Sequence, residues 1–153
     1  MKALIQRVTK ASVTVENEKI AEIPEGLFIL LGVQKGDTDN EMKTLAAKTT
    51  ALRIFCDEND KMNKSVLDIG GAALVVSQFT LCAETKKGNR PSFIGAMPPE
   101  EAERLYKAFY EELSRLGVSS VQHGAFGADM LCDIQNDGPV TIMLDTDTWR
   151  KPQ

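Results

Sequence analysis

Gly26-Leu27-Phe28-Ile29-Leu30-Leu31-Gly32-Val33 contains the longest nearly uninterrupted apolar run of the chain. A strand that is apolar on both faces is typical of the centre of a sheet whose two sides are both covered. The run is much shorter than the roughly 20 apolar residues that a membrane-spanning helix needs. We therefore predict a buried central strand in a soluble protein, and place the other segments around it.

The segments before this run predict a hairpin. Residues 2–9 and 11–15 are rich in β-branched side chains and partly alternate, as strands do. A polar turn at residues 16–19 separates them from residues 20–23, which return as the partner strand. Short apolar or alternating runs predict further strands at residues 53–55, 72–76, 118–122, 130–135 and 140–144.

Two segments carry helix signals. Thr38-Asp39-Asn40-Glu41 is a capping-box sequence, and apolar residues follow it at helical spacing to about residue 52. Pro98-Pro99-Glu100-Glu101 begins a second helix with prolines and acids, and Gly117 ends it. Because strands outnumber helices, the sequence predicts an α+β fold, a curved, largely antiparallel β-sheet or barrel with two packed helices. We expect a single domain over residues 1–153, with residues 147–153 as a short C-terminal tail.

The ionisable residues disfavour several classes of protein. The net charge is −4, which argues against a globally basic nucleic-acid-binding surface. The cysteines are Cys56, Cys82 and Cys132, and His123 is the single histidine. This set suits neither a disulfide framework nor a zinc site, and it favours the reducing cytoplasm. The absence of a Walker or Gly-x-Gly-x-x-Gly sequence disfavours nucleotide-driven chemistry.

Two polar motifs stand at the ends of predicted strands. Ser77-Gln78-Phe79-Thr80-Leu81 follows an apolar strand, where polar side chains need backbone or ligand partners. Asn136-Asp137-Gly138-Pro139-Val140-Thr141 separates two strands, because Asp-Gly is a hairpin signal and Pro cannot donate to a ladder. The second motif is either an ordinary turn or a rigid backbone wall that presents the Gly138 and Pro139 carbonyls to a ligand.

Hydroxyl and thiol groups near the first motif are candidate nucleophiles. Thr80 or Cys82 paired with His123 would make a general esterase, although no Gly-x-Ser-x-Gly sequence supports one. A loop at residues 85–95 is either a solvated loop or a local patch for an anionic ligand. It carries cations without an acid, namely Lys86, Lys87 and Arg90.

Together the two polar motifs resemble the paired signature of the D-aminoacyl-tRNA deacylase (D-tyrosyl-tRNA deacylase) family. Either motif alone is a weak signal, whereas the pair in a chain of this length is specific. The similarity runs from Met1 to about Thr146 and includes Gln6-Arg7-Val8 with Ala11-Ser12-Val13, Lys87-Gly88-Asn89-Arg90-Pro91-Ser92-Phe93, and Phe126-Gly127-Ala128-x-Met130.

The resemblance implies an enzyme that hydrolyses the ester between a D-amino acid, or glycine, and the 3′-terminal adenosine of tRNA. It spares the L-aminoacyl ester, which is chiral proofreading in translation. The resemblance further implies a cytoplasmic homodimer with active sites at the subunit interface, and neither a metal nor an organic cofactor. The Gly138–Pro139 peptide bond would be cis and would reach into the partner's site as a chiral filter.

The same resemblance assigns roles to individual residues. Ser77, Gln78, Phe79 and Thr80 form the catalytic motif, with backbone N–H groups near Phe79 and Thr80 as an oxyanion pocket. Thr80 is either the nucleophile or takes no part in the chemistry, in which case the ribose 2′-OH of the substrate assists the hydrolysis. We favour the second, because the sequence offers Thr80 no evident general base. The remaining site residues are Arg7 as a clamp on the Gly138–Pro139 carbonyl side, Phe126 and Met130 in the adenosine pocket, and Lys86, Lys87 and Arg90 on acceptor-stem phosphates.

Two alternatives to this enzyme stay open. One is a dimeric RNA- or ligand-binding module with the same fold and no activity, and the other is the general esterase. Matched D- and L-aminoacyl-tRNA would separate the three, because a binding module hydrolyses neither, an esterase hydrolyses both, and the chiral deacylase hydrolyses the D form alone.

Overall fold

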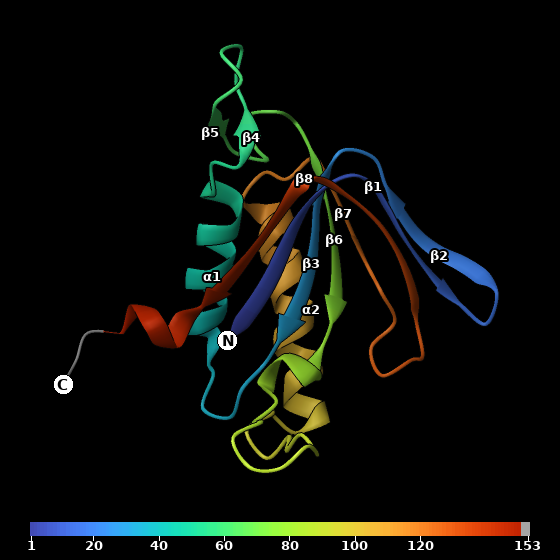
Figure 1. The fold of residues 1–153 in the computed structure, drawn as a ribbon, viewed down its shortest axis with the longest axis vertical. Helices are drawn as coiled ribbons and strands as arrows, with labels where there is room; N and C mark the ends of the chain where they lie inside the picture. The colour runs from blue at the N-terminus through green and yellow to red at the C-terminus, as the bar shows by residue number, and fades with distance from the viewer. Residues whose placement is uncertain (151–153) are drawn as a thin grey trace.

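The structure is a computed structural model that describes residues 1–150, and its fold is built on one curved sheet (Figure 1). The strands of the sheet are β1 (Lys2–Val15), β2 (Glu18–Ile23), β3 (Gly26–Gly32), β6 (Ala72–Ser77), β7 (Ser120–His123) and β8 (Leu131–Asp145). The predicted central strand is confirmed, because β3 lies between β1 and β6 and is buried along nearly its whole length. The predicted hairpin is confirmed as β1 and β2.

The sheet is mixed, whereas the sequence predicted a largely antiparallel one. β1 runs antiparallel to β2, β3 and β8, but β3, β6 and β7 run parallel. The parallel pairs arise because helix α1 (Asp39–Ala51) connects β3 to β6 and helix α2 (Pro99–Arg115) lies between β6 and β7. A helical crossover returns the chain in its original direction, whereas a tight turn reverses it.

Each face of β3 is covered by a different layer, which explains why its sequence is apolar throughout. Leu27, Ile29 and Leu31 pack into the core shared with the helices. Phe28 points the other way, into a second core beneath the curled β1–β2 hairpin. Alternate side chains of a strand lie on opposite faces, so a strand buried on both sides needs apolar residues at every position.

Both predicted helices are confirmed within a residue or two of their expected ends. Thr38 caps α1 with the predicted capping box, in which the Thr38 N–H donates to Glu41 Oε2 (2.7 Å). The two helices pack against each other on one side of the sheet (Figure 1). The buried stripe of α2 consists of Leu105, Tyr106, Phe109 and Leu113.

The two strands predicted at residues 130–135 and 140–144 are one continuous strand, β8, so the predicted break between them is wrong. Gln6 pairs with Thr141 and Val8 with Asn136, which leaves residues 137–140 opposite Arg7 alone. Pairing with β1 resumes on both sides of this bulge. The Asn136 amide stabilises it by donating to Thr141 Oγ1 (2.9 Å), and Asn136 Oδ1 accepts from the Val140 N–H (3.2 Å). The sheet therefore bends here without ending.

Small elements complete the fold. The strand predicted at residues 53–55 is reduced to a short ladder, and a 3₁₀ helix follows β6 directly. Residues 147–149 of the predicted C-terminal tail belong to a second 3₁₀ helix, and residues 151–153 lie outside the described part of the chain. No helix within residues 1–150 is long and apolar enough to cross a bilayer. These elements are β4 (Phe55–Cys56), β5 (Met62–Lys64), η1 (Phe79–Cys82) and η2 (Thr146–Trp149).

Candidate active site

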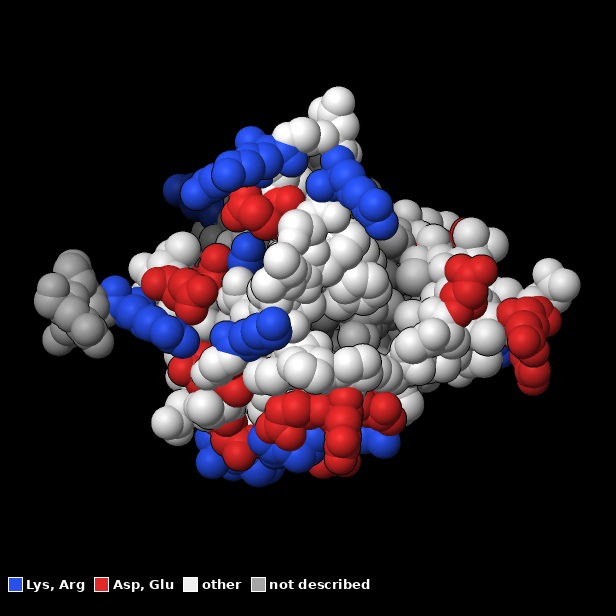
Figure 2. All heavy atoms as spheres, turned by 90° about the horizontal axis from the view of Figure 1, so that it is seen from below, with Lys and Arg blue, Asp and Glu red and all other residues white. Residues whose placement is uncertain are grey.

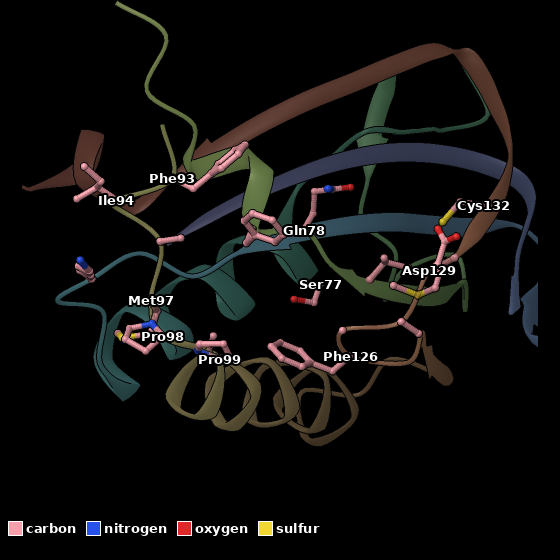
Figure 3. A pocket seen from close by; sticks show the side chains of 18 residues that line it. Ser77, Gln78, Phe93, Ile94, Met97, Pro98, Pro99, Phe126, Asp129 and Cys132 are labelled. Atoms are coloured by element: carbon pink, nitrogen blue, oxygen red, sulfur yellow. The ribbon is translucent and has the colours of Figure 1, made fainter. Parts of the chain in front are cut away.

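A cavity of about 770 Å³ lies beside the carboxyl end of β6 (Figure 3). Its walls come from the end of β6, from η1, from the segment that leads into α2, and from the connection between β7 and β8. The volume falls within the roughly 300–1,000 Å³ that small-molecule sites occupy. Of the residues predicted for the site, those that line the cavity are Ser77, Gln78, Phe79, Phe126 and Met130.

The strand-end motif forms one wall because β6 stops there. The Gln78 N–H still donates to the Leu31 carbonyl (2.8 Å), which continues the pairing with β3, and the chain then turns into η1. Phe79 and Thr80 are the first residues of η1, so their N–H groups precede its first internal hydrogen bonds. The Ser77 side chain points into the cavity (Figure 3).

The connection between β7 and β8 forms the facing wall. Phe126 lies opposite Ser77 (Figure 3), with its ring tilted against Tyr106 at a centroid distance of 5.9 Å. Met130 packs so close to Gly124 that a Cβ at Gly124 would lie 2.6 Å from Met130 Sδ. The absence of a side chain at Gly124 therefore lets Met130 reach the cavity.

The Tyr106 hydroxyl links the two walls of the cavity through hydrogen bonds. The sequence predicted Tyr106 only as a core residue in the apolar stripe of α2. Its hydroxyl lies 3.0 Å from the Val75 carbonyl and 3.2 Å from the Gly124 carbonyl, and donates its one proton between them. Burial raises the pKa of Tyr106 well above its ordinary value, so the phenol stays protonated. Val75 precedes Ser77 by two residues, and Gly124 precedes Phe126 by two.

The candidate base for an esterase lies apart from the candidate nucleophiles. His123 stacks on Tyr110 (centroids 4.2 Å apart) and its Nδ1 bonds the Gly124 carbonyl. No hydrogen bond within residues 1–150 joins it to Thr80 or Cys82. Cys82 is buried, and this burial raises the pKa of its thiol. Thr80 is exposed, accepts a hydrogen bond from Gln78 Nε2, and does not line the cavity.

Gly138 and Pro139 lie on the exposed bulge of β8 and do not line the cavity of their own chain. Their peptide bond is cis, the geometry that the resemblance implied. Arg7 reaches the bulge, but it bonds the Asp137 carbonyl (Nε, 3.2 Å) and the Ile54 carbonyl (Nη1, 2.8 Å). The sequence predicted that Arg7 would clamp the carbonyl side of Gly138–Pro139. In the structure Arg7 bonds the carbonyl of the preceding residue, Asp137.

The predicted basic loop lies at the same end of the molecule as the cavity. Figure 2 views this end and shows an uncharged, hollowed surface with Lys and Arg atoms beside it. The side chains of Lys86, Lys87 and Arg90 are exposed, and no ion pair within residues 1–150 includes them. Backbone hydrogen bonds exchanged by Glu84 and Ser92 (2.8 and 2.9 Å) close the base of the loop.

One end of the cavity was missed by the sequence analysis. Pro98 and Pro99 carried only a helix-start signal, and Lys35 lies far from both in the chain. The Lys35 N–H donates to the Gly95 carbonyl (2.9 Å), which brings the two segments together. No local sequence pattern indicates such a long-range pairing. The missed lining residues include Lys35, Ile94, Met97, Pro98 and Pro99.

Within residues 1–150 no group of three or more His, Cys, Asp or Glu side chains is arranged to hold a metal ion.

Known proteins similar to this chain were found by sequence and by structure. The family model described as D-Tyr-tRNA(Tyr) deacylase matches residues 4–145. A D-aminoacyl-tRNA deacylase of Roseiflexus castenholzii is 56% identical over 153 residues, which are 100% of this chain and 97% of that protein. A protein of the same name from Paracoccus denitrificans is 56% identical over 146 residues, covering 95% of this chain and 97% of that protein.

Two solved structures resemble the fold. The structure titled "c-Myc DNA Unwinding Element Binding Protein" has a TM-score of 0.90 and 48% identity, covering 95% of this chain and 98% of that one. The structure titled "Structural Analysis of a probable eukaryotic D-amino acid tRNA deacylase" has a TM-score of 0.78 and covers 94% of this chain and 97% of that one. At 16% identity the second similarity concerns the fold alone.

Proposed function

This chain belongs to the D-Tyr-tRNA(Tyr) deacylase family, and on that premise we propose that it hydrolyses the ester of D-aminoacyl-tRNA to free D-amino acid and tRNA. It is a hydrolase that spares L-aminoacyl-tRNA, and its role is chiral proofreading in translation. The observation that carries the proposal is the cavity itself. It has Ser77, Gln78 and Phe79 on one wall and Phe126 with Met130 on the facing wall.

The wall formed by Phe126 and Met130 suits the terminal adenosine of tRNA. Proteins bind unpaired bases by stacking them on aromatic rings, and a thioether adapts its shape to an irregular ligand surface. An adenosine held against Phe126 would direct its 3′ ester towards Ser77, which lies opposite (Figure 3).

The chemistry we propose is attack of water on the ester carbonyl with the developing oxyanion held at the start of η1. Backbone N–H groups that face a developing oxyanion stabilise the transition state without reorganisation. We propose that the N–H groups of Phe79 and Thr80, the first residues of η1, serve this role. Because Thr80 is exposed and no hydrogen bond within residues 1–150 joins it to His123, we assign proton transfer to the ribose 2′-OH beside the ester and not to a Thr80 nucleophile. The 3′ oxygen leaves as the restored ribose hydroxyl.

Homodimer formation would complete the site, and the free edge of β8 supports it. Within residues 1–150, β8 pairs with β1 alone. Its side chains Leu131 (67% exposed) and Met143 (49% exposed) face solvent in one chain. A long free edge with exposed apolar side chains is prone to pair with another chain. We propose that a second copy covers this region and brings its own Gly138–Pro139 to the neighbouring cavity.

The Gly138–Pro139 backbone would then act as the chiral filter. A backbone wall against the α-carbon admits hydrogen on one side and rejects a side chain there by overlap, so L-amino acids are excluded whatever their side chain. Glycine has no side chain to reject, and glycyl-tRNA is therefore a predicted substrate. Arg7 would hold the wall in place through the Asp137 carbonyl, since a guanidinium is a rigid donor fork.

We assign the basic loop to the acceptor stem of tRNA. Exposed cations that no acid neutralises attract phosphates in a salt-dependent way. Lys86, Lys87 and Arg90 supply them on a protein whose net charge is −4. We propose that the reaction takes place in the cytoplasm, a reducing compartment that suits the free cysteines of this chain.

Incubation of the protein with matched D- and L-tyrosyl-tRNA tests the proposal. We expect release of D-tyrosine and no release of L-tyrosine above the buffer rate. Hydrolysis of neither ester would favour a non-catalytic RNA-binding module, and hydrolysis of both would favour a general esterase. The protein's oligomeric state, measured by light scattering in the same buffer, tests the dimer separately.

A further inference from the structure

The cavity is also lined by residues to which the proposed function assigns no contact with the nucleoside or its ester. Asp129 and Cys132 lie at one end, with Ser77 and Phe126 between them and the opposite end, which is lined by Ile94, Met97 and Pro98 (Figure 3). We call this opposite end the outer end and define it by Lys35, Phe93, Ile94, Met97, Pro98 and Pro99.

The outer end exposes large apolar side chains beside a cation. Ile94 is 78% exposed, the highest value among the large apolar side chains of the described residues, and the neighbouring Phe79 is 56% exposed. Phe93 meets Phe79 edge to face at a centroid distance of 5.1 Å, so the two rings present differently oriented surfaces. Clustered exposed apolar side chains next to a cavity mark a binding surface.

The backbone fixes this surface in place. Met97 donates to the Val33 carbonyl (2.9 Å) and Lys35 donates to the Gly95 carbonyl (2.9 Å), which joins the segment before α2 to the end of β3. Ala96 donates to the Phe93 carbonyl (3.1 Å), which closes a turn around Ile94. Because the backbone of this turn is already held by hydrogen bonds, little conformational entropy of the backbone would be lost when a ligand binds.

The charges around the cavity differ between its two ends. Lys35 lines the outer end, and no ion pair within residues 1–150 involves it. Asp129 is the one carboxylate among the lining residues, and it lies at the opposite end, near Cys132 (Figure 3). The outer end therefore suits a ligand with a flat apolar part and an anionic group.

We propose that the outer end binds an unpaired nucleobase, that of the nucleotide preceding the terminal adenosine, with Lys35 facing its phosphate. This inference rests on the proposed function and names a second subsite of the same cavity. Single-stranded nucleic acids bind where exposed aromatic and apolar surfaces adjoin cations, and the outer end combines the two. An unpaired base fits better than a base pair, because a paired base has its faces stacked within the duplex.

The inference is tested by comparing two substrates that share the same ester. One is D-tyrosyl-tRNA and the other is 3′-O-D-tyrosyl-adenosine, which has no preceding nucleotide. For Ile94→Ser we expect the ratio of kcat/KM for tRNA to kcat/KM for the adenosine ester to fall about fivefold, the low end of a base-stacking contribution. Ile20→Ser, at another exposed isoleucine, is the matched control and should leave the ratio unchanged.

An abasic nucleotide before the terminal adenosine gives the complementary measurement. The abasic nucleotide should lower kcat/KM of the unsubstituted protein about tenfold. In Ile94→Ser, where the contact with the base is already weakened, it should lower kcat/KM little further. The inference would be overturned if Ile94→Ser lowered kcat/KM equally for the tRNA and the adenosine ester. It would also be overturned if the abasic nucleotide lowered kcat/KM equally for the unsubstituted protein and for Ile94→Ser. If the unsubstituted protein releases tyrosine from neither substrate, the proposed function itself fails, which is a different result from an unchanged ratio.

Discussion

The cavity and the bulge of β8 are built in opposite ways, although both are assigned to one site. The cavity is assembled from four segments of the chain whose backbones are joined by hydrogen bonds and by the buried Tyr106 hydroxyl. The bulge is exposed, and Arg7, 11% exposed in its side chain, holds it from one side. We infer that the cavity provides affinity for the nucleoside and that the bulge provides selectivity between D and L esters.

This division makes different predictions for substitutions in the two regions. A substitution in the cavity should weaken the binding of D-aminoacyl-tRNA and of glycyl-tRNA to the same extent, because both substrates carry the same terminal adenosine. A change in the bulge should alter the ratio of D to L hydrolysis.

Gly138→Ala should cause the largest change. Gly138 has φ of +123°, and an added Cβ would lie 2.9 Å from Val140 Cγ2 and 3.0 Å from Arg7 Nη2. The bulge must shift, and a misplacement of about 1 Å at a site costs about 100-fold in rate. We expect a loss of that size in the D-to-L ratio of kcat/KM.

Gly70→Ala is the matched control for that substitution. Gly70 also has a positive φ (+64°), but nothing lies within 4 Å of an added Cβ. If both variants keep the D-to-L ratio of the unsubstituted protein, the bulge is not the filter and the division of roles is wrong.

Phe126→Ala should raise KM for D-aminoacyl-tRNA about 30-fold, because loss of a base–aromatic stack costs about 2 kcal/mol. The D-to-L ratio should not change. Steady-state kinetics with both esters measure the two quantities, and Phe126→Leu, which keeps apolar volume, should give a smaller rise. A changed D-to-L ratio would show that the cavity also selects chirality.

Replacing Lys86 and Lys87 together by alanine should raise KM for tRNA about tenfold at low salt, with a shallower salt dependence, because fewer counterions are released on binding. The adenosine ester, which lacks the acceptor stem, should be hydrolysed as before. An unchanged KM for tRNA at moderate salt would reject the assignment of this loop.

Tyr106→Phe should raise KM about fivefold, since one buried hydrogen bond contributes about 1 kcal/mol. Both carbonyls keep a second donor, because the Gly124 N–H bonds Val75 and His123 Nδ1 bonds Gly124. Tyr106 is thus a positioning residue, so kcat should change little. Tyr110→Phe, one turn further along α2, is the control. A fall in kcat with KM intact would contradict this role.

Thr80→Ala should have the smallest effect, a loss of about threefold in kcat, because Thr80 is exposed and its hydroxyl hydrogen-bonds only the Gln78 side chain among the described residues. Single-turnover rates measure the chemical step directly. Abolished turnover in a folded variant would identify Thr80 as a nucleophile.

Much of the local structure could be predicted from the chain. The capping box at Thr38 and Glu41 determines where α1 begins, and the apolar run of β3 indicates a strand covered on both faces. These signals work because caps and strand periodicity depend on residues within a few positions of one another.

Some residues of the site could be predicted from the sequence, and others could not. Ser77 and Phe126 were found through motif resemblance, and they do face each other across the cavity (Figure 3). Tyr106 looked like an ordinary core residue, because a buried hydroxyl with backbone partners carries no sequence signal. Lys35 and Ile94 were missed because a backbone bond between distant segments brings them together.

The sequence therefore specifies the helices, the central strand and the two polar motifs, since each follows from local propensity and periodicity. Three features depend on long-range pairing instead. They are the parallel order of β3, β6 and β7, the continuity of β8 through its bulge, and the separation of Gly138 from Ser77 within one chain. Strand partners are chosen by how distant segments pack together, and no local pattern encodes that choice.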